Sequence, residues 1–80
     1  MNNEAELHTV AVAVRYLKNN RATLQQALGE GVQWIKVKGD STLAIGMASG
    51  GYKPGKPYFW HLVKEIKSII KGLPWRIMWE

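Results

Sequence analysis

Residues 34–43 read Trp-Ile-Lys-Val-Lys-Gly-Asp-Ser-Thr-Leu and contain the change of pattern that decides the fold. Residues 32–38 alternate between two faces and are rich in β-branched side chains, which predicts a strand with a partly exposed second face. The Asp40-Ser41 step then opens a new apolar run, as an N-cap opens a helix. Asp40 therefore follows the carboxyl end of a strand, where ligands bind in open α/β sheets. It is equally a candidate helix cap, and the two roles are compatible.

The segment before this strand predicts a helix that begins near Asn2 or Asn3, either of which can act as its N-cap. Glu6 lies in the first turn, where an acid interacts favourably with the helix dipole. Apolar side chains recur at intervals of three and four residues, namely Leu7, Val10, Val14 and Leu17. A further helical segment is expected over residues 22–28, and the glycines at positions 29 and 31 end it.

The segment after the strand predicts two more helices and a second strand. A short helix over residues 41–48, starting at Asp40 or Ser41, is followed by a basic loop over residues 52–57 and by a longer helix that starts near Tyr58. The longer helix has an apolar face and a basic flank of Lys64, Lys67 and Lys71. Gly72 ends it, and residues 75–80 again alternate. The resulting order, helix-strand-helix-helix-strand, predicts an α/β fold in which a crossover joins two parallel strands.

Composition limits the class of protein. Eighty residues make one small domain with a thin core. Eleven Lys and Arg against six Asp and Glu give a net charge of +5, which suits a polyanionic partner such as nucleic acid. The chain has no cysteine, and no apolar run is as long as the roughly 20 residues that span a bilayer. The start is polar and acidic, unlike a secretory signal, so we expect an intracellular protein of the cytoplasm or nucleus with no membrane partner.

Three motifs in this order resemble type 1 ribonuclease H domains, and in particular their retroelement and plant reverse-transcriptase-associated branch. Residues 2–7 read Asn-Asn-Glu-Ala-Glu-Leu, similar to the start of the first helix of that family. Residues 37–41, Val-Lys-Gly-Asp-Ser, resemble the strand end that carries another of its acids, and residues 51–53, Gly-Tyr-Lys, resemble a loop that follows. The resemblance covers nearly the whole chain and implies a ribonuclease-H-like fold.

The resemblance implies a metal-dependent nuclease that hydrolyses the RNA strand of RNA/DNA hybrids. In the family, clustered carboxylates hold two Mg²⁺ ions about 3.5–4 Å apart. Glu6 and Asp40 match two of these acids and are our candidate catalytic residues and metal ligands. Asn2 and Asn3 match positions that contact the minor groove of the hybrid, where 2′-hydroxyls distinguish RNA from DNA.

The chain also departs from the family pattern. The residues that match the family include only two of its four carboxylates, and they do not include the three-stranded antiparallel meander that precedes the first helix. We therefore expect a partial domain, with weak or no hydrolysis of its own. The strand that ends at Asp40 should have an exposed hydrogen-bonding edge, which a partner chain that supplies the missing strands would cover.

The individual residues also have simpler explanations. Lys53 and Lys56 of the basic loop are candidate substrate contacts, whereas the helical lysines are as well explained by a solvated face. The four tryptophans are expected in the core more often than in stacking on bases. His8 and His61 have no ligand spacing. Three hypotheses remain: a piece of a ribonuclease H domain, a non-catalytic nucleic-acid-binding module, and a fragment that depends on a partner chain.

Overall fold

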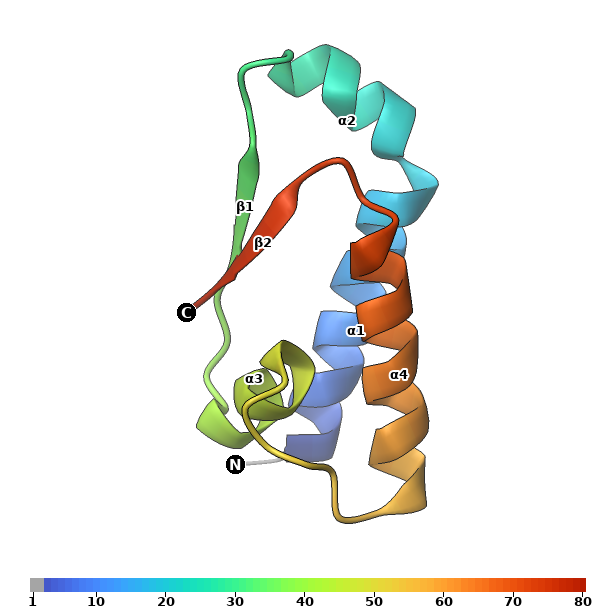
Figure 1. Ribbon diagram of the computed structural model, residues 1–80, viewed down its shortest axis with the longest axis vertical. Coiled ribbons are helices and arrows are strands. Elements are labelled where there is room, and N and C mark those ends of the chain that lie inside the picture. Colours follow the sequence, from blue (N-terminus) through green and yellow to red (C-terminus); the bar gives the residue numbers. More distant parts are fainter. Residues whose placement is uncertain (1–2) are drawn as a thin grey trace.

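The computed structural model describes residues 3–80 and, for Asn3, only its place in the backbone. Four helices and two strands follow one another along the chain (Figure 1). They are α1 (Asn3–Asn19), α2 (Arg21–Leu28), β1 (Trp34–Val37), α3 (Thr42–Ser49), α4 (Pro57–Lys71) and β2 (Arg76–Trp79). This order confirms the predicted mixed α/β class. The helical segment expected over residues 22–28 is a separate helix, α2, so the structure has one more helix than the predicted order.

The core lies between α1, α4 and α3. The apolar faces predicted for α1 and α4 are confirmed, because the side chains of Leu7, Val14 and Ile66 are fully buried there. α3 adds Ala44, Met47 and Ala48 to the same cluster. α1 packs mainly against α4, and the two helices lie side by side (Figure 1). The periodicity of the two long helices therefore accounts for most of the buried apolar surface.

The two strands form a parallel pair in which Trp34 is opposite Arg76 and Val37 is opposite Trp79. This confirms the predicted parallel arrangement, with strands shorter than the alternating stretches of sequence. Ile35 and Val37 are half-buried on one face of β1, while the other face is exposed, as the alternation predicted. β2 repeats this pattern, and its Trp79 packs against the helical core.

The two ends of the molecule differ in how they are covered. α2 lies at one end and α3 at the other, with the strands beside α1 and α4 between them (Figure 1). α2 has no buried residue, and it ends at Gly29, whose positive φ of 82° favours glycine. α3 has three buried residues and ends at Gly50, which has a φ of 94°. Packing in the core therefore stabilises α3, whereas α2 has no buried side chain and is stabilised mainly by its own backbone hydrogen bonds.

The tryptophans divide between core and surface. Trp75 is 4% exposed and lies within the domain, whereas Trp34 is 49% exposed and Trp60 is 54% exposed. The general expectation of a core position is therefore wrong for Trp60, which lies on the outer face of α4, whereas Trp34 lies on the face of β1 that the alternation predicted to be partly exposed. Within residues 3–80, no helix is both long enough and apolar enough to cross a membrane.

Candidate functional site

The fold brings Glu6 of α1 to the end of β1. The backbone N–H of Asp40 donates a hydrogen bond of 3.2 Å to Oε1 of Glu6, although 34 residues separate the two in sequence. Glu6 lies one turn into α1, and Asp40 lies between the last residue of β1 and the first of α3. The two acids that the sequence predicted as metal ligands thus come from separate elements, and the contact between them at the carboxyl end of β1 joins the Asp40 backbone to the Glu6 carboxylate.

Gly39 allows this close approach of the strand end to α1. A Cβ atom at position 39 would overlap Oε1 of Glu6 and would lie 2.9 Å from Cδ1 of Ile45. Any residue larger than glycine would therefore push the loop away from α1 or displace the carboxylate. The glycine of the Gly-Asp-Ser motif is a steric requirement of the contact between Glu6 and Asp40.

Ser41, and not Asp40, caps α3. The Oγ atom of Ser41 accepts a hydrogen bond of 3.1 Å from the backbone N–H of Ala44, and Ser41 is 1% exposed. The role of helix cap proposed for Asp40 is therefore wrong, because the extended backbone of Ser41 places its own side chain under the first turn. Asp40 is exposed and keeps its carboxylate outside the helix start.

Carboxylates such as those of Glu6 and Asp40 suit Mg²⁺ chemically, although the contact that the structure shows between these residues is made by the Asp40 backbone. Carboxylate oxygens are ligands that Mg²⁺ prefers, and the ion is commonly held by one or two of them, with waters and substrate phosphate completing the shell. Within residues 3–80, no group of three or more His, Cys, Asp or Glu residues is close enough to hold a metal ion. Asn2 and the side chain of Asn3 lie outside the described residues, so their role in substrate binding stays a prediction.

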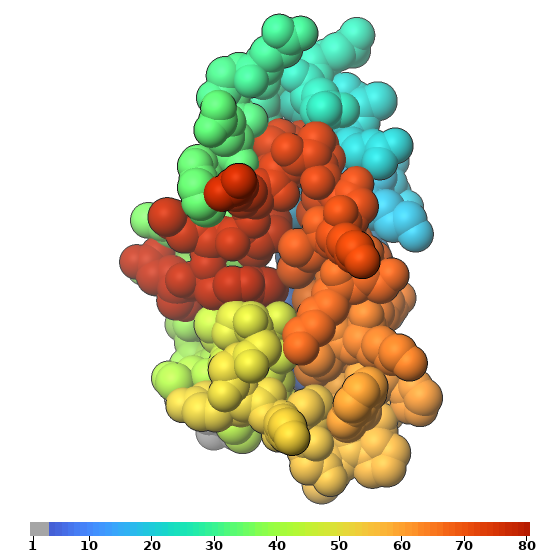
Figure 2. All heavy atoms as spheres, in the orientation of Figure 1, coloured from blue at the N-terminus to red at the C-terminus, as the bar shows by residue number. Residues whose placement is uncertain are grey.

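A second candidate site is a basic groove, which we define by Tyr52, Lys53, Trp60, Lys64 and Lys67. These residues line a cavity of about 500 Å³ between α4 and the loop after α3. The ammonium group of Lys64 lies 5.8 Å from the centre of the Trp60 ring, within the range of a cation–π interaction. The loop and α4 occupy the lower part of the face in Figure 2. Cations and exposed aromatic rings in one groove are the combination that binds phosphates and stacks bases.

Two lysines of the predicted basic loop, Lys53 and Lys56, lie in different places relative to the basic groove. Lys53 lines the basic groove, whereas Lys56 precedes α4 and does not line it. The ring of Tyr52 lies directly over Gly46 of α3, where a Cβ atom would overlap it. Trp60 and Lys67 enter the groove because α4 turns them toward this loop, which no local pattern in the sequence indicated.

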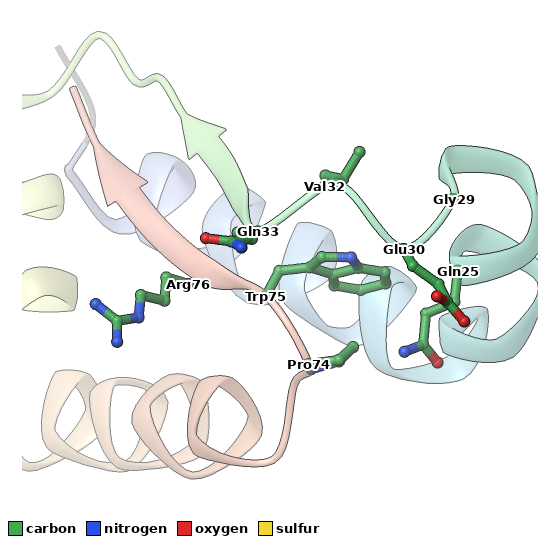
Figure 3. Close-up of a pocket in the computed structure, with 8 residues that line it drawn as sticks. All are labelled: Gln25, Gly29, Glu30, Val32, Gln33, Pro74, Trp75 and Arg76. Carbon is green, nitrogen blue, oxygen red and sulfur yellow. The ribbon is translucent and has the colours of Figure 1, made fainter.

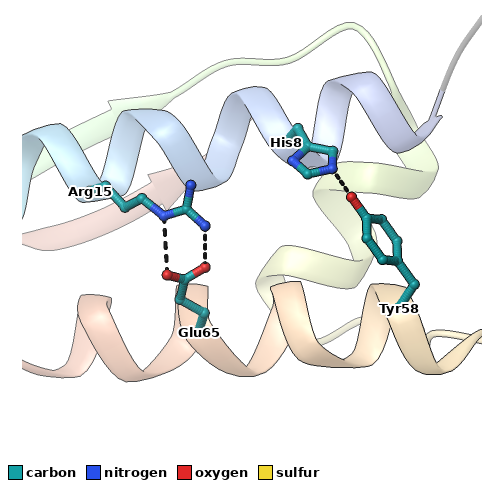
Figure 4. A network of polar contacts seen from close by, with 4 residues as sticks. All are labelled: His8, Arg15, Tyr58 and Glu65. Atoms are coloured by element: carbon teal, nitrogen blue, oxygen red, sulfur yellow. Dashed lines mark hydrogen bonds and ion pairs between the residues drawn. The ribbon is translucent and has the colours of Figure 1, made fainter.

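Two polar contacts tie α1 to α4 on the side shown in Figure 4. Nε of Arg15 donates to Oε2 of Glu65 at 3.1 Å, and a second guanidinium nitrogen donates to Oε1. Hydrogen bonding to Arg15 holds the pKa of the Glu65 carboxyl below its ordinary value. His8 is hydrogen-bonded through Nε2 to the Tyr58 hydroxyl. Each pair is 50 residues apart in sequence, and neither was foreseen.

Another cavity, of about 450 Å³, lies near the amino ends of the two strands. Its lining includes Gln25 and Glu30 from α2 and the loop after it, and the ring of Trp75 lies between them and the strands (Figure 3). The Arg76 side chain points away from these residues in the same view. This cavity is at the opposite end of β1 from Asp40, so it does not belong to the carboxylate site.

Comparison of the chain with known proteins gives no match among family models, curated proteins or solved structures. The arguments for function below therefore rest on the residues and on their geometry.

Proposed function

We propose that the chain is part of a ribonuclease-H-type domain, in which Glu6 and Asp40 are ligands of a catalytic Mg²⁺ ion and the substrate is an RNA/DNA hybrid. The observation that carries this proposal is the contact between the Glu6 carboxylate and the backbone of Asp40. Two acids chosen from separate motifs of the sequence lie side by side in the fold.

The chemistry expected of this site is phosphodiester hydrolysis. Mg²⁺, when bound there, supplies positive charge that activates water and stabilises the leaving oxygen. The Glu6 and Asp40 carboxylates would hold and orient the ion, and the hydrogen bond from the Asp40 backbone N–H keeps the Glu6 side chain beside the loop. The exposure of Asp40 leaves room for a phosphate group next to it.

The positive charge of the chain supports a nucleic-acid substrate. The basic groove combines three lysines with two aromatic rings, and its neighbour Lys56 is exposed at the start of α4. Each phosphate neutralised by a lysine releases counterions, so binding through these residues falls steeply as salt rises. Lys53 and Lys56 are the proposed contacts of the loop with the hybrid.

The proposed catalysis by this chain is weak. A two-ion mechanism needs more oxygen ligands than two carboxylates provide, and residues 3–80 contain no larger acidic cluster. The expected activity is a slow, Mg²⁺-dependent cleavage or none, with hydrolysis at full rate belonging to an intact domain that has further acids.

A second candidate function is a non-catalytic nucleic-acid-binding module. The basic groove favours it, because stacking on Tyr52 or Trp60 together with lysine contacts needs no metal ion. This alternative keeps the nucleic-acid partner and assigns Glu6 a structural role as the acceptor that holds the loop after β1.

Binding of Mn²⁺, a paramagnetic substitute for Mg²⁺, tests the carboxylate site. We expect amide resonances of residues 39–41 to broaden at the lowest Mn²⁺ concentrations in the wild type, and to stay sharp in Asp40→Asn. Glu30→Gln is the matched control, since Glu30 is an exposed acid at the far end of β1. Broadening that is as strong around Glu30 as around Asp40 would contradict the metal site.

Cleavage and binding of a labelled RNA/DNA hybrid, measured in the same samples, separate the two candidate functions. Mg²⁺-dependent cleavage that disappears in Asp40→Asn and persists in Glu30→Gln supports the nuclease. Salt-sensitive binding without cleavage, weakened by Lys53→Gln and unaffected by Asp40→Asn, supports the binding module where Mn²⁺ also fails to bind near Asp40. Absence of binding at low salt would exclude both functions for this chain.

A further inference from the structure

The sheet has one edge with a vacant position beside it. Arg76 N–H donates to the carbonyl of Gln33, and Glu80 N–H donates to the carbonyl of Val37, so alternate residues of β1 face β2. In a parallel pair, the residues between them direct their N–H and C=O groups the other way. The backbone groups of Trp34 and Lys36 therefore point to an edge that no other strand within residues 3–80 covers.

An apolar wall of α1 extends beyond this edge. A groove of about 480 Å³ lies between β1 and α1, and its lining includes Val12, Tyr16 and Ile35. Val12 is 59% exposed and Tyr16 is 58% exposed, although both belong to the central turns of the best-packed helix of the domain. No residue of β2 lines this groove. The edge of β1 thus combines unpaired backbone groups with an apolar surface that a third strand would cover.

The charge around the groove indicates what kind of strand fits. Lys36 and Lys38 line it, and within the described residues only Lys36 has an acidic neighbour, Glu80 at 3.6 Å. A second copy of this chain, paired through the same edge, would bring further lysines to the rim of a protein that already carries a charge of +5. An acidic segment would instead neutralise the lysines.

We propose that the groove between α1 and β1 accepts an extended segment of another polypeptide, which adds to the sheet as a third strand beside β1. Its side chains on the α1 side are apolar and pack on Val12 and Tyr16. Its side chains on the other face are acidic and lie beside Lys36. Main-chain hydrogen bonds to Trp34 and Lys36 provide affinity, and the alternation of apolar and acidic side chains along the segment provides specificity. The proposal concerns the edge as residues 3–80 leave it, since strands of an intact ribonuclease-H-type domain would occupy the same position. It involves neither Glu6 nor Asp40, so its failure is distinguishable from failure of the metal site.

A short peptide that alternates valine and glutamate, with blocked ends, is the probe. Its binding is measured by amide hydrogen exchange resolved by NMR. We expect the Trp34 and Lys36 amides to become protected on saturation, while the Ile77 and Trp79 amides at the edge of β2 stay unchanged. A peptide with lysine in place of glutamate is the charge control, and we expect it to bind about tenfold more weakly at low salt, because several exposed ion pairs are lost.

Neutral variants test the apolar wall. The double variant Val12→Gln, Tyr16→Gln should weaken binding about tenfold, because it removes apolar surface from the groove. Leu28→Gln, which changes an exposed apolar residue of α2, should leave binding unchanged. Thermal unfolding of each variant checks that the fold is intact, which we expect because all three side chains are exposed.

Four results would overturn the proposal. They are no protection of the Trp34 and Lys36 amides at millimolar peptide, protection confined to β2, equal binding of the lysine peptide, and equal binding by the double variant. Protection of the same two amides without peptide, growing with protein concentration, would show that a second copy occupies the edge and would equally contradict an acidic partner.

Discussion

The helical half of the molecule and its sheet bury their apolar residues to very different extents. Ile66 at the centre of α4 is fully buried, as are Leu7 and Val14 of α1. In the sheet, no strand residue is fully buried, and every second one is exposed. The helices close on one another, whereas the sheet is covered by helices on one face and has open edges. Stability should therefore come from the helices, while the sheet and its loops supply the surfaces that are available for function.

The two regions should differ most in the free energy of unfolding lost when isoleucine is replaced by alanine. Ile66→Ala should lower the free energy of unfolding by about 3 kcal/mol, because it leaves a cavity in the core. Ile35→Ala should cost only about 1 kcal/mol, because the side chain of Ile35 is already half in water. Urea unfolding followed by tryptophan fluorescence measures both. Equal costs would show that the sheet is as well packed as the helices.

The junction between the regions is tested at Gly39. Gly39→Ala should cost about 1–2 kcal/mol, because its methyl group would overlap Glu6 Oε1 and crowd Ile45. It should also weaken Mn²⁺ binding near Asp40, since either the loop or the Glu6 carboxylate must move. Gly31→Ala is the control, because a Cβ atom at position 31 has no neighbour within 4 Å. Gly39→Ala with unchanged stability and unchanged metal binding would contradict the close approach.

The cap of α3 gives a smaller effect. Ser41→Ala removes the acceptor of the Ala44 N–H and should cost about 1 kcal/mol in the free energy of unfolding. Asp40→Ala should cost less, because Asp40 does not cap the helix. Chemical denaturation of the two variants side by side checks the order. A larger loss of unfolding free energy for Asp40→Ala would indicate that Asp40 caps the helix.

The smallest effect is expected on the solvent side of the α1–α4 pair. The pKa of Glu65 lies below its ordinary value because its charged form is hydrogen-bonded to Arg15. The stabilisation is thus complete above the ordinary carboxyl pKa and is lost as pH falls through the lowered one. Wild type should be slightly more stable than Glu65→Gln at neutral pH, and the difference should vanish in acid. Since both side chains are more than a third exposed, solvent screens the pair, and salt should reduce the difference too. A difference in melting temperature that does not change with pH would exclude the ionic origin.

Much of the fold could be predicted from local patterns. The three- and four-residue spacing in α1 and α4 places Leu7, Val14 and Ile66 on buried faces, and the alternation in β1 separates Ile35 from Lys36, as the structure confirms. Glycine marks the ends of α2, α3 and α4. These features depend on neighbours within a turn or two, so the sequence contains the information directly.

The candidate site could be predicted only in part. Glu6 and Asp40 were chosen by their motifs, and Lys53 by its basic loop. No pattern in the sequence predicted that Trp60 would line one groove with Tyr52 and Lys67, because α4 and the loop after α3 come together only in the folded domain. The exposure of Trp60 likewise differed from the expectation for large aromatic residues.

The sequence by itself determined the two strands, the helices α1, α3 and α4 and the apolar faces of the long helices, because helical and strand periods are properties of short stretches. Only the tertiary structure decided that the Asp40 backbone meets Glu6, that Ser41 is the cap, and that Arg15 pairs with Glu65. Contacts between residues 34 or 50 positions apart depend on the angle at which α1 meets α3 and α4. The open edge of β1 likewise follows from which strands lie beside it, and no residue of the strand encodes that alone.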